Sequence, residues 1–367
     1  MYDDRCDQLA KLVTEWSLGV REGQKVIVKG PDCAKPLMLA LEKHIYEAGG
    51  FPWFQIAFAE SEEIAFRHAS DTMLSWPCDL DMEAVERFDA FVLIQGEDNP
   101  KAHSRVPPAR RAMALAAAMP ARNAVMRRAA TGSFAWTAAV WPTAGYANEA
   151  DMSILDFEDA LFRSCLPEGK NSVAHWRSVE ERQHAAIEAL AGAREVRIEA
   201  EGTDLRLSVA GRLWGNGCGK HNLPDGEIYS GPLEDSAEGR IRFPGRVLYK
   251  GGEARGIELR FEKGLVVEAS AESGGDFLAA MLDTDPAARR LGEFAFGMNE
   301  GITELCGQIL LDEKAGGTMH IALGNGYPQT GSTNRSALHW DLVLDTRKGG
   351  RVTIDGRLVL ENGVYAI

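Results

Sequence analysis

The sequence lacks the features that would direct it to a membrane or out of the cell. None of its apolar runs approaches the ~20 residues that a membrane-spanning helix needs. The N-terminal stretch MYDDRCDQLAKLVTEW is charged from its third residue and contains no apolar core of the kind that a signal peptide has. We therefore expect a cytoplasmic protein with no membrane partner.

Closely spaced cysteines and a net positive charge are also missing. The six cysteines form no C-x-x-C pair, which excludes a zinc ribbon and a thioredoxin-type motif and favours buried thiols in a reducing compartment. The formal net charge is −14, and because phosphates repel an acidic surface we expect no nucleic-acid partner. No G-x-G-x-x-G motif follows the first expected strand, so a dinucleotide site has no support.

The composition is that of an ordinary globular protein, with 45% hydrophobic and 26% charged residues. A chain of 367 residues is longer than one hydrophobic core usually serves. We therefore predict two domains, at residues 1–175 and 176–367.

The first domain alternates short apolar strands with helices. Its strands are expected at residues 25–30, 51–57, 88–96 and 134–142. Its helices are expected at residues 2–16, 36–48, 61–75, 106–130 with a break at Pro120, and 152–165. This alternation predicts an α/β domain with helices on the faces of its sheet.

The second domain has a different sequence pattern, because most of its segments alternate apolar and polar residues, as strands with one solvent-exposed face do. Its strands are expected at residues 195–200, 204–209, 239–243, 246–249, 256–261, 265–269 and 351–354. Helices are expected at residues 178–193, as a connector, and from 275 to 291. The pattern predicts an α+β domain rich in antiparallel sheet.

The triplet His339-Trp340-Asp341 carries the clearest chemical signal. If residues 337–344 form a strand, the imidazole and the carboxylate project side by side while Trp340 faces the other way. Imidazole and carboxylate ligands suit Zn²⁺, Fe²⁺, Co²⁺ or Mn²⁺. A core histidine paired with a carboxylate is the alternative explanation for an isolated H-x-D motif.

Two isolated acids stand in unusual surroundings. Glu227 follows the turn Pro224-Asp-Gly226, and Glu293 is framed by Gly, Phe and Ala in the run LGEFAFG. A buried carboxylate must be neutral, hydrogen-bonded or bound to a metal. Taken singly, each acid is better explained as an exposed turn residue.

Four blocks, taken in order, resemble the thermophilic-type metalloaminopeptidases, the family of aminopeptidase T, aminopeptidase S and PepS. The blocks are Pro224-Asp-Gly-Glu227, Leu291-Gly-Glu293-Phe-Ala, the stretch 311–324 that contains His320, and Asn334-Arg-Ser-Ala-Leu-His339-Trp-Asp341. Tyr327 follows the third block, where the family has a tyrosine. The first half of the chain matches only in its general α/β character.

The resemblance implies a site in the second domain that holds two divalent metal ions, such as Zn, Co, Mn or Mg. The ligands that it implies are Glu227, Glu293, His320, His339 and Asp341. It also implies that Tyr327 lies at the site and that Glu313 is a further ligand or supports one. In such a site Tyr327 can donate a hydrogen bond to the oxyanion, and both Glu313 and the acid that bridges the metals qualify as the general base. The implied protein is a homodimer that uses a metal-activated water to hydrolyse the N-terminal residue from peptides or acts on a related small molecule.

The same fold also resembles the 2,5-dihydroxypyridine ring-opening dioxygenases, which hold a single Fe²⁺. In this alternative His339 and Asp341 bind Fe(II) together with either His320 or Glu293. The position that Glu293 occupies here carries a histidine in that pattern, which favours the two-metal hydrolase. A metal-binding protein without catalysis is the third hypothesis.

Overall fold

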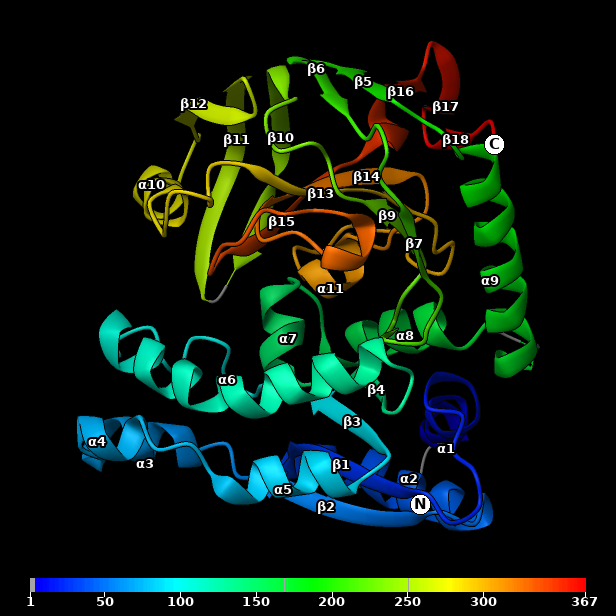
Figure 1. Cartoon of the computed structure of the whole chain (residues 1–367), viewed down its shortest axis with the longest axis vertical. Coiled ribbons are helices and arrows are strands. Elements are labelled where there is room, and N and C mark those ends of the chain that lie inside the picture. Colours follow the sequence, from blue (N-terminus) through cyan, green and yellow to red (C-terminus); the bar gives the residue numbers. More distant parts are fainter. Residues whose placement is uncertain (1–3, 168, 170, 250) are drawn as a thin grey trace. The chain divides into compact units, whose positions relative to one another are not determined.

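The computed structural model describes residues 4–367 except 168, 170 and 250, and these residues fold into two compact units (Figure 1). The first unit contains the chain up to Trp176 together with Gly219–Pro224. The second contains Arg177–Cys218 and Asp225–Ile367. Among the described residues, no helix combines the length and the apolar character that crossing a membrane requires.

The first unit is built on a parallel sheet, as the alternation of strands and helices predicted. Neighbouring strands run parallel throughout the order β2-β1-β3-β4-β8. The strands are β1 Lys25–Pro31, β2 Phe51–Ala57, β3 Ala90–Gln95, β4 Ala135–Val140 and β8 Asn222–Leu223. The last of these comes from the returning segment Gly219–Pro224, which sequence periodicity did not assign to this sheet.

The helices of the first unit differ from the prediction in four places. The expected helix 61–75 is two helices, because the Ser70 side chain accepts a hydrogen bond from the Met73 N–H and caps a second one. The expected break at Pro120 is wrong, since an alanine-rich helix continues through it. Two helices were not predicted: α5 precedes β3, and α7 follows β4. The bounds are α1 Asp4–Leu12, α2 Lys35–Glu47, α3 Ser61–His68, α4 Asp71–Leu74, α5 Asp79–Arg87, α6 Pro108–Ala130, α7 Ala144–Glu149, α8 Ile154–Cys165 and α9 Ser172–Ala189, which continues into the second unit.

The second unit is rich in antiparallel sheet, as predicted, and its strands form two separate sheets. One has the order β12-β11-β10-β6-β5-β16-β17-β18, and the other has the order β15-β14-β13-β9-β7. The strands of the first are β5 Glu195–Ala200, β6 Thr203–Ser208, β10 Glu238–Tyr249, β11 Gly252–Glu262, β12 Leu265–Ser270, β16 Arg351–Ile354, β17 Arg357–Glu361 and β18 Val364–Tyr365. Those of the second are β7 Trp214–Gly217, β9 Glu227–Ser230, β13 Leu291–Gly297, β14 Thr318–Gly324 and β15 His339–Leu344.

One predicted helix of the second unit is wrong in a way that matters for the site. The helix expected from 275 to 291 ends early, as α10 Gly275–Leu282. Pro286 lies in the turn that follows and has no backbone N–H with which to continue a helix. Leu291 therefore begins β13, and Glu293 lies on a strand. A further short helix, α11 Ile309–Asp312, precedes β14.

Candidate metal centre

The β15-β14-β13-β9-β7 sheet has two chemically opposite faces. Because side chains alternate along a strand, each strand divides its residues between these faces. One face belongs to the hydrophobic core that both sheets of the unit share, and it carries Ile228, Phe294, Phe296, Met319, Ile321, Leu323, Trp340, Leu342 and Leu344. The opposite face carries the predicted site residues Glu227, Glu293, His320, His339 and Asp341.

Small residues stand across the strands from these polar side chains. Ala295 is paired with His320, and Ala322 is paired with Asp341. Gly297 is paired with Glu227, and a Cβ there would lie 2.3 Å from the Ala315 carbonyl oxygen. The alanines leave the space above the sheet to the longer polar side chains, and glycine at 297 allows the backbone of Ala315 to approach the sheet.

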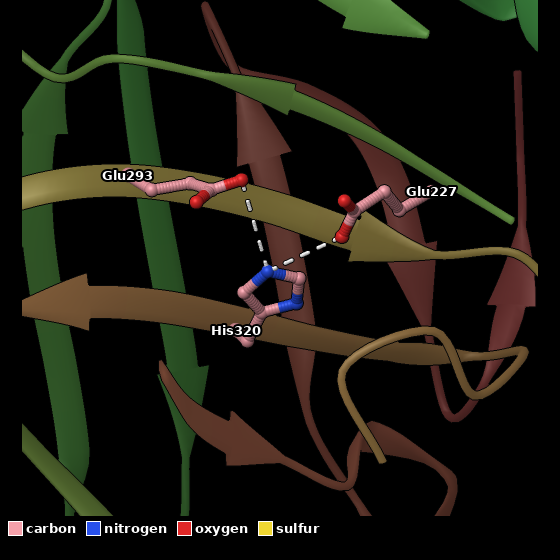
Figure 2. A group of neighbouring side chains, drawn as sticks. All are labelled: Glu227, Glu293 and His320. Atoms are coloured by element: carbon pink, nitrogen blue, oxygen red, sulfur yellow. Dashed lines mark ion pairs between the residues drawn. The ribbon is translucent and has the colours of Figure 1, made fainter. Parts of the chain in front are cut away.

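The polar side chains converge on two neighbouring points. His320 Nε2 lies 3.5 Å from Glu227 Oε2 and 4.0 Å from Glu293 Oε1, and Figure 2 shows these three side chains turned toward one another. His339 Nε2 lies 3.4 Å from Glu293 Oε2 and 3.5 Å from Asp341 Oδ1. We call Glu227–Glu293–His320 the Glu227 triad and Glu293–His339–Asp341 the His339 triad. Each triad offers ligand atoms within 4.8 Å of one another, and Glu293 belongs to both.

The donor atoms of both triads fit a divalent metal. Their mutual distances exceed the ~2.7–3.2 Å of a hydrogen bond, and they match ligands that each lie ~2.0–2.2 Å from a common ion. Glu227 Oε2 and Asp341 Oδ1 are buried without a hydrogen-bond partner. Such oxygens are costly unless a cation satisfies them.

Both imidazoles are prepared to bind metal through Nε2. His339 Nδ1 donates a hydrogen bond to the Asn325 carbonyl oxygen 2.8 Å away, which turns Nε2 toward the triad. Burial acts to lower the pKa of His339, but the Asp341 carboxylate outweighs it and the pKa is raised well above its usual range, so a metal bound at Nε2 would take the place of a proton. Burial lowers the pKa of His320 to about 4, which keeps this ring in the neutral form that metal ligands require.

The carboxylates crowd together out of contact with water. Burial raises the pKa of Glu293 well above its usual range, and the neighbouring Glu227 carboxylate raises it further. Burial likewise raises the pKa of Glu313 to about 8, although Lys314 opposes this change. Burial also acts to raise the pKa of Asp341, but the adjacent His339 outweighs it and the pKa is lowered. The centre therefore has more acids than its own cations neutralise.

Tyr327 lies at the more open side of the centre. Its hydroxyl is 3.5 Å from His339 Nε2, and the His339 side chain is 28% exposed, more than its partners in the triad. Burial raises the pKa of Tyr327 well above its usual range, so the hydroxyl keeps its proton and can donate it in a hydrogen bond. Behind it the Tyr229 ring packs at 5.3 Å, and Gln329 Nε2 donates a 3.4 Å hydrogen bond to the Tyr229 hydroxyl.

Lys314 is the residue that the sequence analysis did not single out. Its side chain is 3% exposed, and Nζ forms ion pairs with Glu227 Oε1, with Glu313 Oε1 at 2.9 Å and with Asp225 Oδ1 at 3.8 Å. Asp312, which directly precedes Glu313 in the sequence, faces elsewhere and accepts hydrogen bonds from the backbone N–H groups of Cys306 and Gly307. The structure thus brings all seven predicted site residues together and adds Lys314 and Asp225 to them.

Comparisons with known proteins show the family and the fold of this chain. The sequence profile of the family described as thermophilic metalloprotease (M29) matches residues 2–365. Aminopeptidase 2 of Geobacillus stearothermophilus is 29% identical over 360 residues, covering 89% of this chain and 85% of that protein. Aminopeptidase T of Thermus aquaticus is 26% identical over 401 residues, covering 99% and 96%. The solved structure of wild-type AmpT from Thermus thermophilus matches with a TM-score of 0.86 at 24% identity, covering 100% of both chains, which confirms the predicted fold class.

Proposed function

The chain belongs to the thermophilic metalloprotease family (M29), as its four sequence blocks indicated, and from this premise we propose that it is a metal-dependent aminopeptidase. Its substrates in this proposal are peptides with a free N-terminal residue, because the relatives named above are aminopeptidases. The observation that carries the proposal is the pair of triads sharing Glu293.

We assign two divalent ions to the centre, one to each triad. Five buried carboxylates surround it, and Lys314 is the buried ammonium that pairs with three of them; the carboxylates are Asp225, Glu227, Glu293, Glu313 and Asp341. With both imidazoles neutral, these groups leave four negative charges, which two divalent cations balance. Buried charge needs such compensation. Zn, Co, Mn and Mg all suit this mixture of carboxylate and imidazole ligands.

When bound there, such ions supply a water of lowered pKa and polarise a substrate carbonyl. The protein's own groups do the rest. Tyr327 holds its hydroxyl proton at the open side of the centre, where it donates a hydrogen bond to the oxyanion that develops on the scissile carbonyl. A preorganised donor of this kind contributes about 3 kcal/mol.

Glu313 is the group that accepts the proton of the attacking water in this proposal. Its carboxylate is buried beside the Glu227 triad, and the Lys314 ammonium 2.9 Å away holds it in place. Glu227 and Asp341 are adjacent negative charges, and they favour the protonated form of Glu313 once the proton has moved.

The ring-cleaving dioxygenase alternative has no support from these observations. The two relatives named above are aminopeptidases, and the side chains form two triads around a shared carboxylate rather than a single three-ligand site. The predicted cytoplasmic location and homodimer stay predictions, and size-exclusion chromatography with light scattering tests the second of them.

The test of the proposed function is the substitution His339→Ala, with turnover of an aminoacyl p-nitroanilide and metal content per chain as readouts. We expect one ion fewer per chain and loss of turnover, with an unchanged far-UV circular dichroism spectrum. His184→Ala is the matched control, because that side chain is 66% exposed on α9. Full turnover in His339→Ala, or in wild-type protein stripped of metal by a chelator, would overturn the assignment.

A further inference from the structure

Lys314 is a fully buried cation that the proposed chemistry does not use. Its ion pairs all lie on one side of the centre, with Glu227, Glu313 and Asp225. Within the described part of the chain, no ion pair joins it to Glu293 or Asp341, the two acids of the His339 triad. The lysine is therefore a fixed positive charge in direct contact with the Glu227 triad, and it acts on the two acids of the His339 triad only at longer range.

The two oxygens of the Glu227 carboxylate have different surroundings. Oε1 accepts a hydrogen bond from the Lys314 ammonium. Oε2 has no hydrogen-bond partner and faces His320 Nε2 at 3.5 Å. A metal held by the Glu227 triad would share its carboxylate with an ammonium group in direct contact, whereas neither acid of the His339 triad forms an ion pair with Lys314 among the described residues.

We propose that Lys314 makes the two metal positions unequal, so that the His339 triad fills first and the Glu227 triad binds its ion more weakly. This inference rests on the two-ion assignment of the proposed function. Like charges repel more strongly in a buried site than in water, and the repulsion falls with distance. The effect of Lys314 therefore falls mainly on the triad that it contacts.

The experiment is a calorimetric titration of metal-free protein with Co²⁺. For the wild type we expect two binding events whose Kd values differ by about tenfold or more. In Lys314→Met, which keeps much of the side-chain volume and removes the charge, the weaker Kd falls toward the tighter one by about tenfold while the tighter one changes little. Lys348→Met is the matched control, because that lysine is 81% exposed, and it leaves both Kd values unchanged.

Two further variants assign the events to the triads. Glu227→Gln removes the weaker event and keeps the tighter one, whereas His339→Ala removes the tighter one. If Lys314→Met does not fold, Lys314→Gln removes the same charge and retains a hydrogen-bond donor. The assignment of the two binding events to the triads needs only the Glu227 and His339 variants.

Three results separate this inference from the one on which it rests. Binding of a single ion per chain in the wild type defeats the two-ion assignment. Two ions of equal affinity leave that assignment intact and overturn the role of Lys314. The role of Lys314 is also overturned if the difference between the two Kd values persists unchanged in Lys314→Met and Lys314→Gln, or if the weaker event belongs to the His339 triad.

Discussion

Strands β9, β13, β14 and β15 place apolar core residues on one face of their sheet and the candidate metal ligands on the other. Phe294 and Trp340 on one face are completely buried in the hydrophobic core. Glu293 and Asp341, their immediate neighbours in sequence, face the metal centre and are buried as well. Both faces exclude water, but burial stabilises the apolar face and destabilises the charged one. The core face thus stabilises the fold, while the site face opposes folding unless cations are bound.

Substitutions of two adjacent residues of β13, one on each face of the sheet, give the largest expected difference between the two faces. Glu293→Gln removes the carboxylate that both triads share. We expect turnover to fall by more than about 100-fold, because losing a residue that only supports a metal ligand already lowers activity by up to about 100-fold. Metal-free Glu293→Gln keeps or exceeds the wild-type free energy of unfolding, because a costly buried charge is gone. Phe294→Ala does the reverse and lowers that free energy by about 3–5 kcal/mol. Urea unfolding and p-nitroanilide turnover measure both, and a Glu293→Gln protein as unstable as Phe294→Ala would contradict the division of labour.

The free energy of unfolding of the metal-free protein, measured as a function of pH, tests whether buried acids destabilise the site face. Glu313 has a pKa of about 8 in the folded chain, against about 4.3 when unfolded. Between these values the folded state binds more protons than the unfolded state, so the free energy of unfolding decreases as pH rises from about 4.3 to about 8. Glu313→Gln removes this contribution, and we expect a shallower slope in urea titrations across that window. Identical slopes in the wild type and the variant would show that Glu313 does not bear a destabilising buried charge.

The smallest expected effect concerns Tyr229, which lies on the site face two residues after Glu227. A Cβ at Gly215 would lie 2.2 Å from Tyr229 Cζ, so Gly215→Ala displaces that ring and disturbs Tyr327, which packs on it. We expect turnover about tenfold lower with two ions still bound, since a ~1 Å misplacement costs up to ~10²-fold. Gly245→Ala is the control, because no atom lies within 4 Å of the added Cβ. Equal losses in both variants would mean that the Tyr229 ring has no positioning role.

Sequence patterns were most informative where they were local. Alternation within residues 337–344 predicted that His339 and Asp341 share a face and that Trp340 takes the other, and the strand has that arrangement. Pattern reasoning failed at β13 and β14, which were not predicted as strands. Both are buried on both faces, so their apolar runs show no alternation of apolar and polar residues that would distinguish a strand.

The order of residues along the chain therefore specifies the strands with one wet face and the H-x-D pair, because periodicity and ligand chemistry are properties of short segments. The other candidate ligands were predicted only through the resemblance of four sequence blocks to a known family. Only the folded chain decides that Glu293 is shared by two triads and that Lys314 lies against one of them. Those relations join residues as far apart as Glu227 and Asp341 through the pairing of β9, β13, β14 and β15. Strand register, which many packing contacts determine together, is what brings them within a few ångströms.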